Sequence, residues 1–302
     1  MKEIKQTEVY YPSYYKDFHC IADKCTHSCC VGWEIQVDYK TLQNYKKLKQ
    51  DEILRHIKDG EITLTDDDRC PFLMQNGLCK IIASLGEGCI SEICREHPRF
   101  YNGVCGRIEC GIGASCEEAC RIILSSDGYC DMYPSLTEEK IPAYESDFDT
   151  VSHRAYLYSV ISDKTLSYTE KIALIKEKYT LTNPIHSPSK WMDILSELEY
   201  LDVSHKGTFS VGRSPANDAA AKLCERFLAY LIFRHVSIAE NHLNLCARLG
   251  FCLLICSVLE DFLAEEHTFA ETVEFVRTLS EEIEYSEENT SSLIFEFECF
   301  LN

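Results

Sequence analysis

Apolar residues recur every three to four positions through most of the second half of the chain, which is the spacing of amphipathic helices. Two connections rich in Pro, Gly and Ser, 183–189 and 206–215, separate some of these stretches. We expect a helix in each of six segments: 151–162, 169–179, 191–201, 216–235, 241–265 and 270–284. The pattern therefore predicts that the second half is helical.

The first half shows shorter and more mixed patterns. WEIQVD, starting at Trp33, alternates apolar and polar residues and predicts a short strand, as does EITLT after Gly60. Between them, residues 39–60 have the apolar spacing of an amphipathic helix or helix pair that ends at Gly60. Asn76-Gly77 is a strong hairpin-turn signal. This part is predicted to be irregular, with short strands.

A further helix is expected after GIGASC, with Ser115 as its N-cap and two glutamates in its first turn. Gly111-x-Gly113 comes close to a nucleotide-binding glycine loop, but Cys116 occupies the third glycine position and no clear βαβ unit surrounds it. The helix cap is the better interpretation of this stretch.

These patterns predict the fold class. We expect a mainly α protein with a small cysteine-rich N-terminal part, irregular or with short strands, that binds metal, followed by an α-helical C-terminal region. The predicted domains are a metal- or iron–sulfur-binding module at 1–130 and a helical domain at 131–302. A chain of 302 residues is long enough for two such domains.

Charge limits the classes of partner. The formal net charge is −19, and residues 1–130 carry 16 basic against 20 acidic residues, whereas the rest carries 14 against 29. Such a protein repels phosphate backbones, so we expect no nucleic-acid partner. The acidity serves either as a solvated surface that maintains solubility or as a field that attracts a cationic substrate, such as a lysine-bearing protein or a sulfonium cofactor.

The N-terminal residues have no apolar core of the kind found in a secretory signal, and the longest apolar run, near 250–259, is too short to span a bilayer. We therefore expect a cytoplasmic protein without a membrane partner. Disulfides are rare in that reducing compartment, where clustered cysteines usually bind metal or perform chemistry.

Cysteines are the most unusual feature of the sequence. Thirteen of the 18 lie in residues 1–130, and four fall within FHCIADKCTHSCCVGW, at 20, 25, 29 and 30. This spacing is neither the C-x2-C pair of zinc ribbons nor the ferredoxin run. A radical S-adenosylmethionine motif would need a cysteine where Gly32 stands. The pattern indicates a thiolate metal site and leaves zinc or iron–sulfur open.

The adjacent pair Cys29 and Cys30 poses a further question. Successive side chains tend to diverge, so the two thiols serve different roles or only one binds. With Cys70, Cys79 and Cys94, seven candidate thiolates exceed what one four-coordinate site can use. The later cysteines at 224, 246, 252 and 256 lie on apolar faces and are expected to pack in the core.

Several blocks of the sequence resemble the flagellin lysine-N-methylase (FliB) family, which overlaps a group of zinc- or iron-chelating cysteine proteins. The blocks are FHCIADKCTHSCCVGWEIQVD, CPFL…GLCKI…LGE, C-R-x-x-P-R, Glu109, Ser115-Cys116-x-Glu118-Ala119 and EEIEYSEEN. The chain departs from the family at Glu117, where proline is usual, and at Tyr285, where histidine is usual.

The resemblance implies an enzyme that transfers methyl groups from S-adenosylmethionine to lysine side chains of flagellin or a similar protein, in the cytoplasm. It also implies a metal centre, an iron–sulfur cluster such as 4Fe-4S in preference to zinc. The implied ligands are Cys20, Cys25, Cys29, Cys30, Cys70, Cys79, Cys94 and Cys116.

Methyl transfer requires a neutral lysine amine, so an enzyme of this class must desolvate the amine or remove its proton. Glu284 and Glu288, four residues apart, are catalytic candidates that could position a cationic amine, and an exposed acidic helix is the alternative role for both. Two other functions stay open from the sequence. One is a non-enzymatic zinc- or iron-binding structural or interaction module, and the other is a redox protein with open cysteines.

Overall fold

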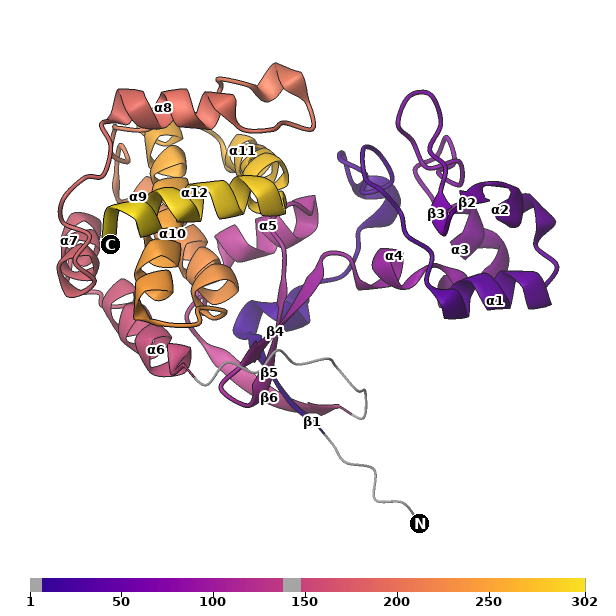
Figure 1. Ribbon diagram of the computed structural model, residues 1–302, viewed down its shortest axis with the longest axis horizontal. Coiled ribbons are helices and arrows are strands. Elements are labelled where there is room, and N and C mark those ends of the chain that lie inside the picture. The colour runs from indigo at the N-terminus through magenta and orange to yellow at the C-terminus, as the bar shows by residue number, and fades with distance from the viewer. Residues whose placement is uncertain (1–6, 138–147, 302) are drawn as a thin grey trace, which may run out of the picture. The chain divides into compact units, whose positions relative to one another are not determined.

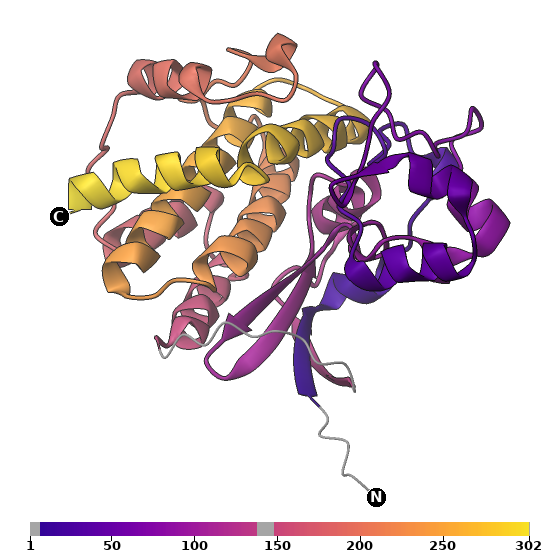
Figure 2. The same ribbon diagram turned by 45° about the vertical axis from the view of Figure 1, so that its right-hand side comes forward.

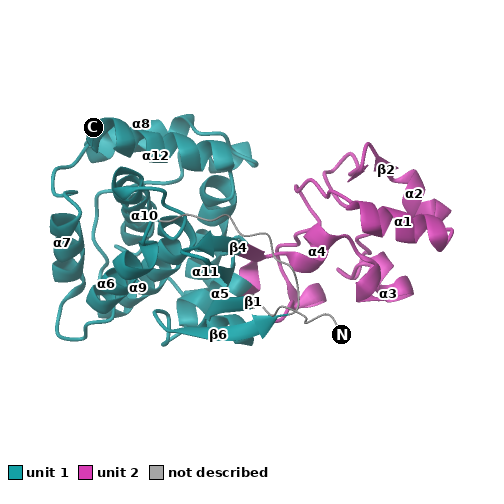
Figure 3. Ribbon diagram, turned by 60° about the horizontal axis from the view of Figure 1, so that its bottom comes forward, with its two compact units in different colours: residues 1–18, 101–115, 119–302 teal, residues 19–100, 116–118 magenta. Residues whose placement is uncertain are grey.

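The computed structural model describes residues 7–137 and 148–301 and is mainly α-helical, as predicted (Figure 1). It divides into two compact units that differ from the predicted boundary at residue 130 (Figure 3). Unit 1 comprises residues 1–18, 101–115 and 119–302, and unit 2 comprises 19–100 and 116–118. The cysteine-rich unit is therefore inserted in sequence between parts of the helical unit.

Unit 1 contains a four-stranded sheet that the sequence patterns did not predict. Its strand order is β4-β5-β1-β6, formed by Arg99–Val104, Arg107–Ile112, Thr7–Pro12 and Met132–Thr137. β1 runs parallel to β5, with Val9 opposite Ile108, and antiparallel to β6. Val9 and Ile112 are fully buried. The sheet thus joins segments about a hundred residues apart in sequence.

The six predicted helices of the second half are confirmed, and an additional helix, α12 (Glu287–Leu301), follows them. Two of the helices end in a π-helical turn, at Ile232–Val236 after α9 and at Ser280–Glu284 after α11. The six predicted helices are α6 (Thr150–Ile161), α7 (Tyr168–Lys178), α8 (Pro188–Glu197), α9 (Asp218–Leu231), α10 (His242–Phe262) and α11 (Phe269–Leu279). α5 (Glu117–Ser125) precedes them, and its first two residues belong to unit 2.

Local sequence explains where these helices begin. Ser167 and Glu170 form a capping box at α7, as Thr268 and Glu271 do at α11, so exposed backbone N–H groups of the first turn gain acceptors. The Asn217 side chain accepts from Ala220 N at 3.0 Å at the start of α9. The helix boundaries are thus set by side chains next to the apolar stretches.

α10 is the central helix of unit 1, and α9 and α12 pack against it (Figures 1 and 2). Gly250 permits this packing, because a Cβ there would lie 2.3 Å from Cδ1 of Phe297 in α12. α10 is also long and apolar enough to cross a membrane, although 72% of its most apolar stretch is buried inside the protein. That burial is typical of a core helix.

Unit 2 contains only short elements. The predicted helix pair after Trp33 is confirmed as α1 (Tyr39–Lys47) and α2 (Asp51–Arg55). The others are β2 (Ile57–Lys58), β3 (Glu61–Ile62), α3 (Lys80–Leu85) and α4 (Glu92–Glu96). Its core is small and consists of Ile35, Val37, Tyr45, Ile53, Ile62, Cys70, Phe72, Ile81 and Ile90. Units with so little apolar core commonly require a staple such as a metal ion.

Two strand predictions in unit 2 need correction. The WEIQVD stretch forms no strand and makes only one isolated bridge, between Gln36 and Glu61. Only two residues of EITLT pair as β3, because its partner β2 is equally short. The turn predicted at Asn76-Gly77 is confirmed: Met74 N donates to Leu78 O at 2.9 Å, and Gly77 has φ +79°.

Candidate functional site

The eight predicted metal ligands all belong to unit 2. Every cysteine of the chain is present as a thiol, and these eight range from buried Cys70 to exposed Cys20, Cys29 and Cys94. Cys116 belongs to unit 2 although it follows β5 of unit 1 in sequence. The structure thus brings the distant Cys116 into the unit that contains the N-terminal cysteines.

Three of these thiols form a hydrogen-bonded group. Cys29 and Cys70 each interact with the sulfur of Cys30, which lowers the pKa of Cys30 to about 3 and raises the pKa of both partners. Cys70 N also donates to Cys30 O at 2.8 Å, so the backbone holds two of the three together. The Cys30 sulfur is thus ionised at neutral pH, and the ionised thiolate is the form of cysteine that binds metal.

The other predicted ligands interact electrostatically with this group. Cys79 acts on Cys70 and Cys94, and Cys94 also interacts with Cys30. Burial is the main reason that the pKa of Cys94 is raised, and the neighbouring thiols add to it. Cys20 and Cys116 act in the same way on Cys29, and Cys116 acts on Cys25. All eight predicted ligands are therefore electrostatic neighbours of another member.

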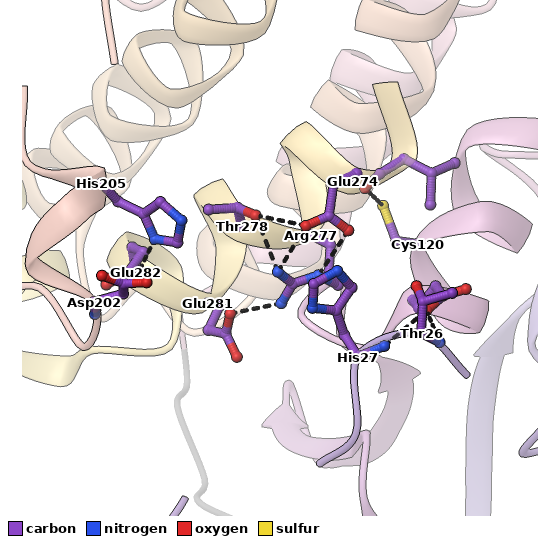
Figure 4. A network of polar contacts seen from close by, with 12 residues as sticks. Thr26, His27, Cys120, Asp202, His205, Glu274, Arg277, Thr278, Glu281 and Glu282 are labelled. Atoms are coloured by element: carbon purple, nitrogen blue, oxygen red, sulfur yellow. Dashed lines mark hydrogen bonds and ion pairs between the residues drawn. The ribbon is translucent and has the colours of Figure 1, made fainter. Parts of the chain in front are cut away.

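Glu117 holds the loop that carries Cys25. Its Oε2 accepts from Thr26 N at 2.7 Å, from Thr26 Oγ1 at 2.6 Å and from His27 N at 3.1 Å, contacts drawn in part in Figure 4. The Cys25 thiol lies 3.5 Å from the same oxygen. Burial and then the Glu117 charge raise the pKa of Cys25 to about 12. This carboxylate, at the position where the chain departs from the family, was not foreseen as part of the site.

Ser115 does not cap α5, contrary to the sequence prediction. The helix begins at Glu117, and the buried Ser115 Oγ has no hydrogen-bond partner.

The geometry and the chemistry of the thiols bear differently on a metal site. In residues 7–137 and 148–301, no group of three or more His, Cys, Asp or Glu side chains is arranged to hold an ion. The donor set nevertheless suits zinc or an iron–sulfur cluster, because thiolates are their preferred ligands and the Cys30 sulfur already interacts with those of Cys29 and Cys70. Metal binding by these cysteines stays a prediction.

Unit 2 also contains a cavity of about 520 Å³ with an acidic lining. Five carboxylates line it: Asp38, Asp59, Glu61, Glu92 and Glu96. Asp38 is already used structurally, because it accepts from Thr41 N and Glu92 N, each at 2.9 Å. Five carboxylates thus gather at one cavity in the less acidic half of the chain.

Glu284, a catalytic candidate from the sequence, lies at the centre of a buried polar cluster in unit 1. Its carboxylate accepts from Tyr230 OH at 2.5 Å and from Ser280 Oγ at 2.8 Å. Burial raises the pKa of Glu284, but the Arg234 charge and the hydrogen bonds outweigh burial, so the pKa lies below its usual value. Glu284 is therefore held ionised and engaged by the protein's own side chains.

The cluster is assembled by the two π-helical turns and the loop after β5. Arg234 lies 4.1 Å from the centre of the Tyr285 ring, and Ala114 N donates to Tyr230 OH at 3.0 Å. A Cβ at Gly113 would lie 1.6 Å from the Tyr285 hydroxyl oxygen, so this position admits only glycine without rearrangement. π-helical turns occur often at functional sites, where they redirect side chains.

Glu288, the second catalytic candidate, is exposed on α12, so the structure does not bring the two candidates into one buried site.

A third carboxylate of the same segment, Glu282, is buried and accepts from Leu201 N at 2.7 Å and from His205 Nδ1 at 2.7 Å (Figure 4). Glu282 thereby fixes the loop after α8. Glu282 stands in an acidic run with Glu281 and Glu284, and this run gave no signal of its burial in the sequence.

Another buried ion pair involves Glu109, which belongs to the family resemblance. Its carboxylate binds Arg154 of α6 and lies 2.5 Å from Arg107 Nη2. Glu109 is fully buried in β5, and Arg154 is buried as well. The pair joins the sheet to the helices of unit 1, which is a structural role.

The fold and the thiol group define a mainly helical protein with an inserted cysteine-rich unit. Over 138 residues the chain is 30% identical to the flagellar biosynthetic protein FliU of Salmonella muenchen, a match that covers 41% of this chain and 80% of FliU. The chain therefore belongs to the FliU family.

Two proteins named lysine-N-methylase, from Salmonella choleraesuis and Salmonella typhimurium, match equally well, at 30% identity over 138 residues. Each match covers 41% of this chain and 34% of the relative, so the chain spans about a third of their length. These matches confirm the resemblance predicted from sequence as a distant relationship. No family profile matches the chain, and no solved structure does.

Proposed function

We propose that this protein is a protein-lysine N-methyltransferase that uses S-adenosylmethionine to methylate flagellin or a similar lysine-bearing protein in the cytoplasm. The relationship to two proteins named lysine-N-methylase carries this proposal. The relationship to a flagellar biosynthetic protein supports flagellin as the substrate class. The net charge of −19 suits a substrate that presents lysines, because it attracts cationic partners.

We further propose that unit 2 holds an iron–sulfur cluster of the 4Fe-4S type or zinc, with thiolates from Cys20, Cys25, Cys29, Cys30, Cys70, Cys79, Cys94 and Cys116. When bound, a cluster supplies electron transfer, whereas zinc supplies a structural staple. The chain's own contribution is to hold the sulfurs together, through the Cys30–Cys70 backbone bond and the Glu117 carboxylate.

The carboxylate candidates differ in how they could serve methyl transfer. Glu284 is engaged by Tyr230, Ser280 and Arg234, so it suits a role in organising the helical unit. Exposed Glu288 is accessible to a lysine side chain of another protein. We therefore propose Glu288, rather than Glu284, as the one that meets a cationic amine.

The alternative function is a non-enzymatic metal-binding or interaction module. The small core of unit 2 favours this alternative, because a centre that only staples the unit would be sufficient reason for its cysteines. An enzyme must in addition bind S-adenosylmethionine, which a stapled module need not do.

The test combines anaerobic purification, metal analysis and a methyl-transfer assay on purified flagellin with isotope-labelled S-adenosylmethionine. We expect label on flagellin lysines, a loss of transfer in the Cys30→Ala variant and retention in Cys89→Ala. A colourless protein that contains only zinc would overturn the iron–sulfur assignment. Absence of transfer by the metal-loaded protein, under reducing and non-reducing conditions, would overturn the enzyme assignment.

A further inference from the structure

Two apolar side chains are presented to solvent by the loop that follows α8 in unit 1. Leu201 is 62% exposed and Val203 is 76% exposed. Asp202 between them has an extended backbone, with φ −110° and ψ 110°, so its two neighbours lie on the same side of the chain. Exposed apolar surface with a polar rim is typical of an interaction site.

The backbone of this loop is fixed by buried side chains of unit 1. Glu282 accepts from Leu201 N at 2.7 Å and from Asp202 N at 3.1 Å. The Asn289 side chain accepts from Glu199 N at 3.1 Å and donates to Glu199 O at 2.7 Å. The apolar side chains are therefore held in place before a partner arrives, so little conformational entropy is lost when one binds.

Carboxylates accompany the two apolar side chains. Residues 196–204 carry three of them and no Lys or Arg. Two of the three, Glu197 and Glu199, are exposed. The hydrogen bonds between Glu199 and Asn289 bring the start of α12 alongside the loop, and Glu288 is exposed there as well. The surface thus combines apolar and negatively charged groups.

Charge distinguishes among the possible occupants of this surface. A second copy of the chain carries a net charge of −19, and nucleic acids and anionic membranes are also negative, so the carboxylates repel all three. A protein segment with lysines next to apolar residues is complementary in both respects. Its amines attract the carboxylates, and its apolar residues remove Leu201 and Val203 from water.

We propose that Glu197, Glu199, Leu201, Val203 and Glu288 form a docking surface for a lysine-bearing, partly apolar segment of the protein substrate. This inference rests on the proposed methyl transfer, in which Glu288 meets the amine, and adds the surface that selects the substrate. The other four side chains contribute to binding and not to the chemical step, so their replacement should change KM and leave kcat unaltered.

The test measures binding of fluorescently labelled flagellin to the protein by anisotropy, which does not require methyl transfer. The L201S/V203S variant should raise Kd about tenfold, because it loses the burial of two apolar side chains. In the methyl-transfer assay its KM should rise with no change in kcat. The E197Q/E199Q variant should raise Kd about fivefold at low salt, and its Kd should depend less on salt than that of the wild type.

The matched control is L174S/E177Q, which alters the same residue types at exposed positions of α7 and should bind flagellin as the wild type does. Circular dichroism checks that each variant is folded. A second measurement needs no variant: carbodiimide labelling of carboxylates, read by mass spectrometry, should show that flagellin protects Glu197 and Glu199 and leaves Glu177 reactive.

An unchanged Kd in L201S/V203S, or equal labelling of Glu197 and Glu199 with and without flagellin, would overturn the docking surface. Absence of saturable flagellin binding by the wild type would overturn it too. Protection of these carboxylates in a dimer without flagellin would assign the surface to a second copy instead. Binding as expected without methyl transfer would overturn the proposed enzymatic function and support the docking surface.

Discussion

Arg234 and Glu284 form an ion pair of 2.8 Å between Nε and Oε1, and the carboxylate is fully buried. The pair joins the π-helical turn after α9 to the one after α11. Each of these turns carries one additional residue relative to a regular α-helix, which rotates the side chains that follow. The two turns therefore face each other with opposite charges.

Replacing Glu284 with glutamine keeps the shape of the side chain and removes its charge. The variant should lose about 3 kcal/mol of unfolding free energy, since removing one charge from a buried ion pair is strongly destabilising. Chemical denaturation of the two proteins measures this difference. The matched control is E288Q on the exposed surface of α12, which should change stability by less than about 0.5 kcal/mol. Equal stability of E284Q and wild type would contradict this role of the pair.

Replacing Gly113 with alanine should destabilise unit 1 by about 2 kcal/mol, the typical cost of overpacking. The new Cβ would meet the Tyr285 hydroxyl oxygen at 1.6 Å and Arg234 Nη1 at 2.9 Å, so the cluster would have to move. Thermal unfolding followed by circular dichroism measures the loss. The control is Gly88→Ala, where no atom lies within 4 Å of the new Cβ, and its unfolding temperature should not fall.

His235 should make the protein less stable in mild acid. Burial lowers the pKa of His235 below 6.5, Arg234 and Arg248 act in the same direction, and Glu284 opposes them. As pH falls below about 6.5, the unfolded chain binds a proton at this side chain that the folded chain does not, so stability decreases. Denaturant titrations between pH 7.5 and 5.5 should show a smaller pH dependence in H235Q than in the wild type. Identical slopes for the two proteins would exclude this contribution.

Glu117 should control the order of the loop at Thr26 and His27. In E117A both backbone N–H groups lose their acceptor, and their hydrogen exchange should accelerate about tenfold, because a bond to a charged group contributes about 1.5 kcal/mol. Hydrogen exchange of the metal-free protein, read by mass spectrometry on the peptide that contains the loop, measures this change. The control Glu52→Ala removes a carboxylate that binds Lys80 elsewhere in unit 2 and should leave the loop unchanged.

The helices were predictable because their apolar period is a local property of the sequence. The sheet was not, because β1 finds its partners only in β5 and β6, far along the chain. In β5 the buried residues are consecutive, so its pattern lacks the alternation that marks a half-buried strand. Pairing between distant segments leaves no periodic signal in either of them.

Part of the candidate site was predictable from the sequence and part was not. Cysteine spacing and the family resemblance identified the eight thiols, because neither kind of evidence depends on tertiary structure. The role of Glu117 depends on a contact between residues about ninety positions apart, so only the fold reveals it. Burial of Glu284 was equally hidden, because its partners Tyr230 and Arg234 come from a different part of the chain.

Unit 2 is inserted in sequence between β1 and the other strands of the unit 1 sheet, and this order affects how the sheet can form during synthesis. During translation the N-terminal strand emerges first, and residue 9 must wait for residue 108 before it can pair. The segment 19–100, with its eight cysteines, is synthesised in that interval. Closure of the sheet in unit 1 therefore waits until the whole cysteine-rich segment has left the ribosome, so unit 2 can begin to fold before unit 1 is complete.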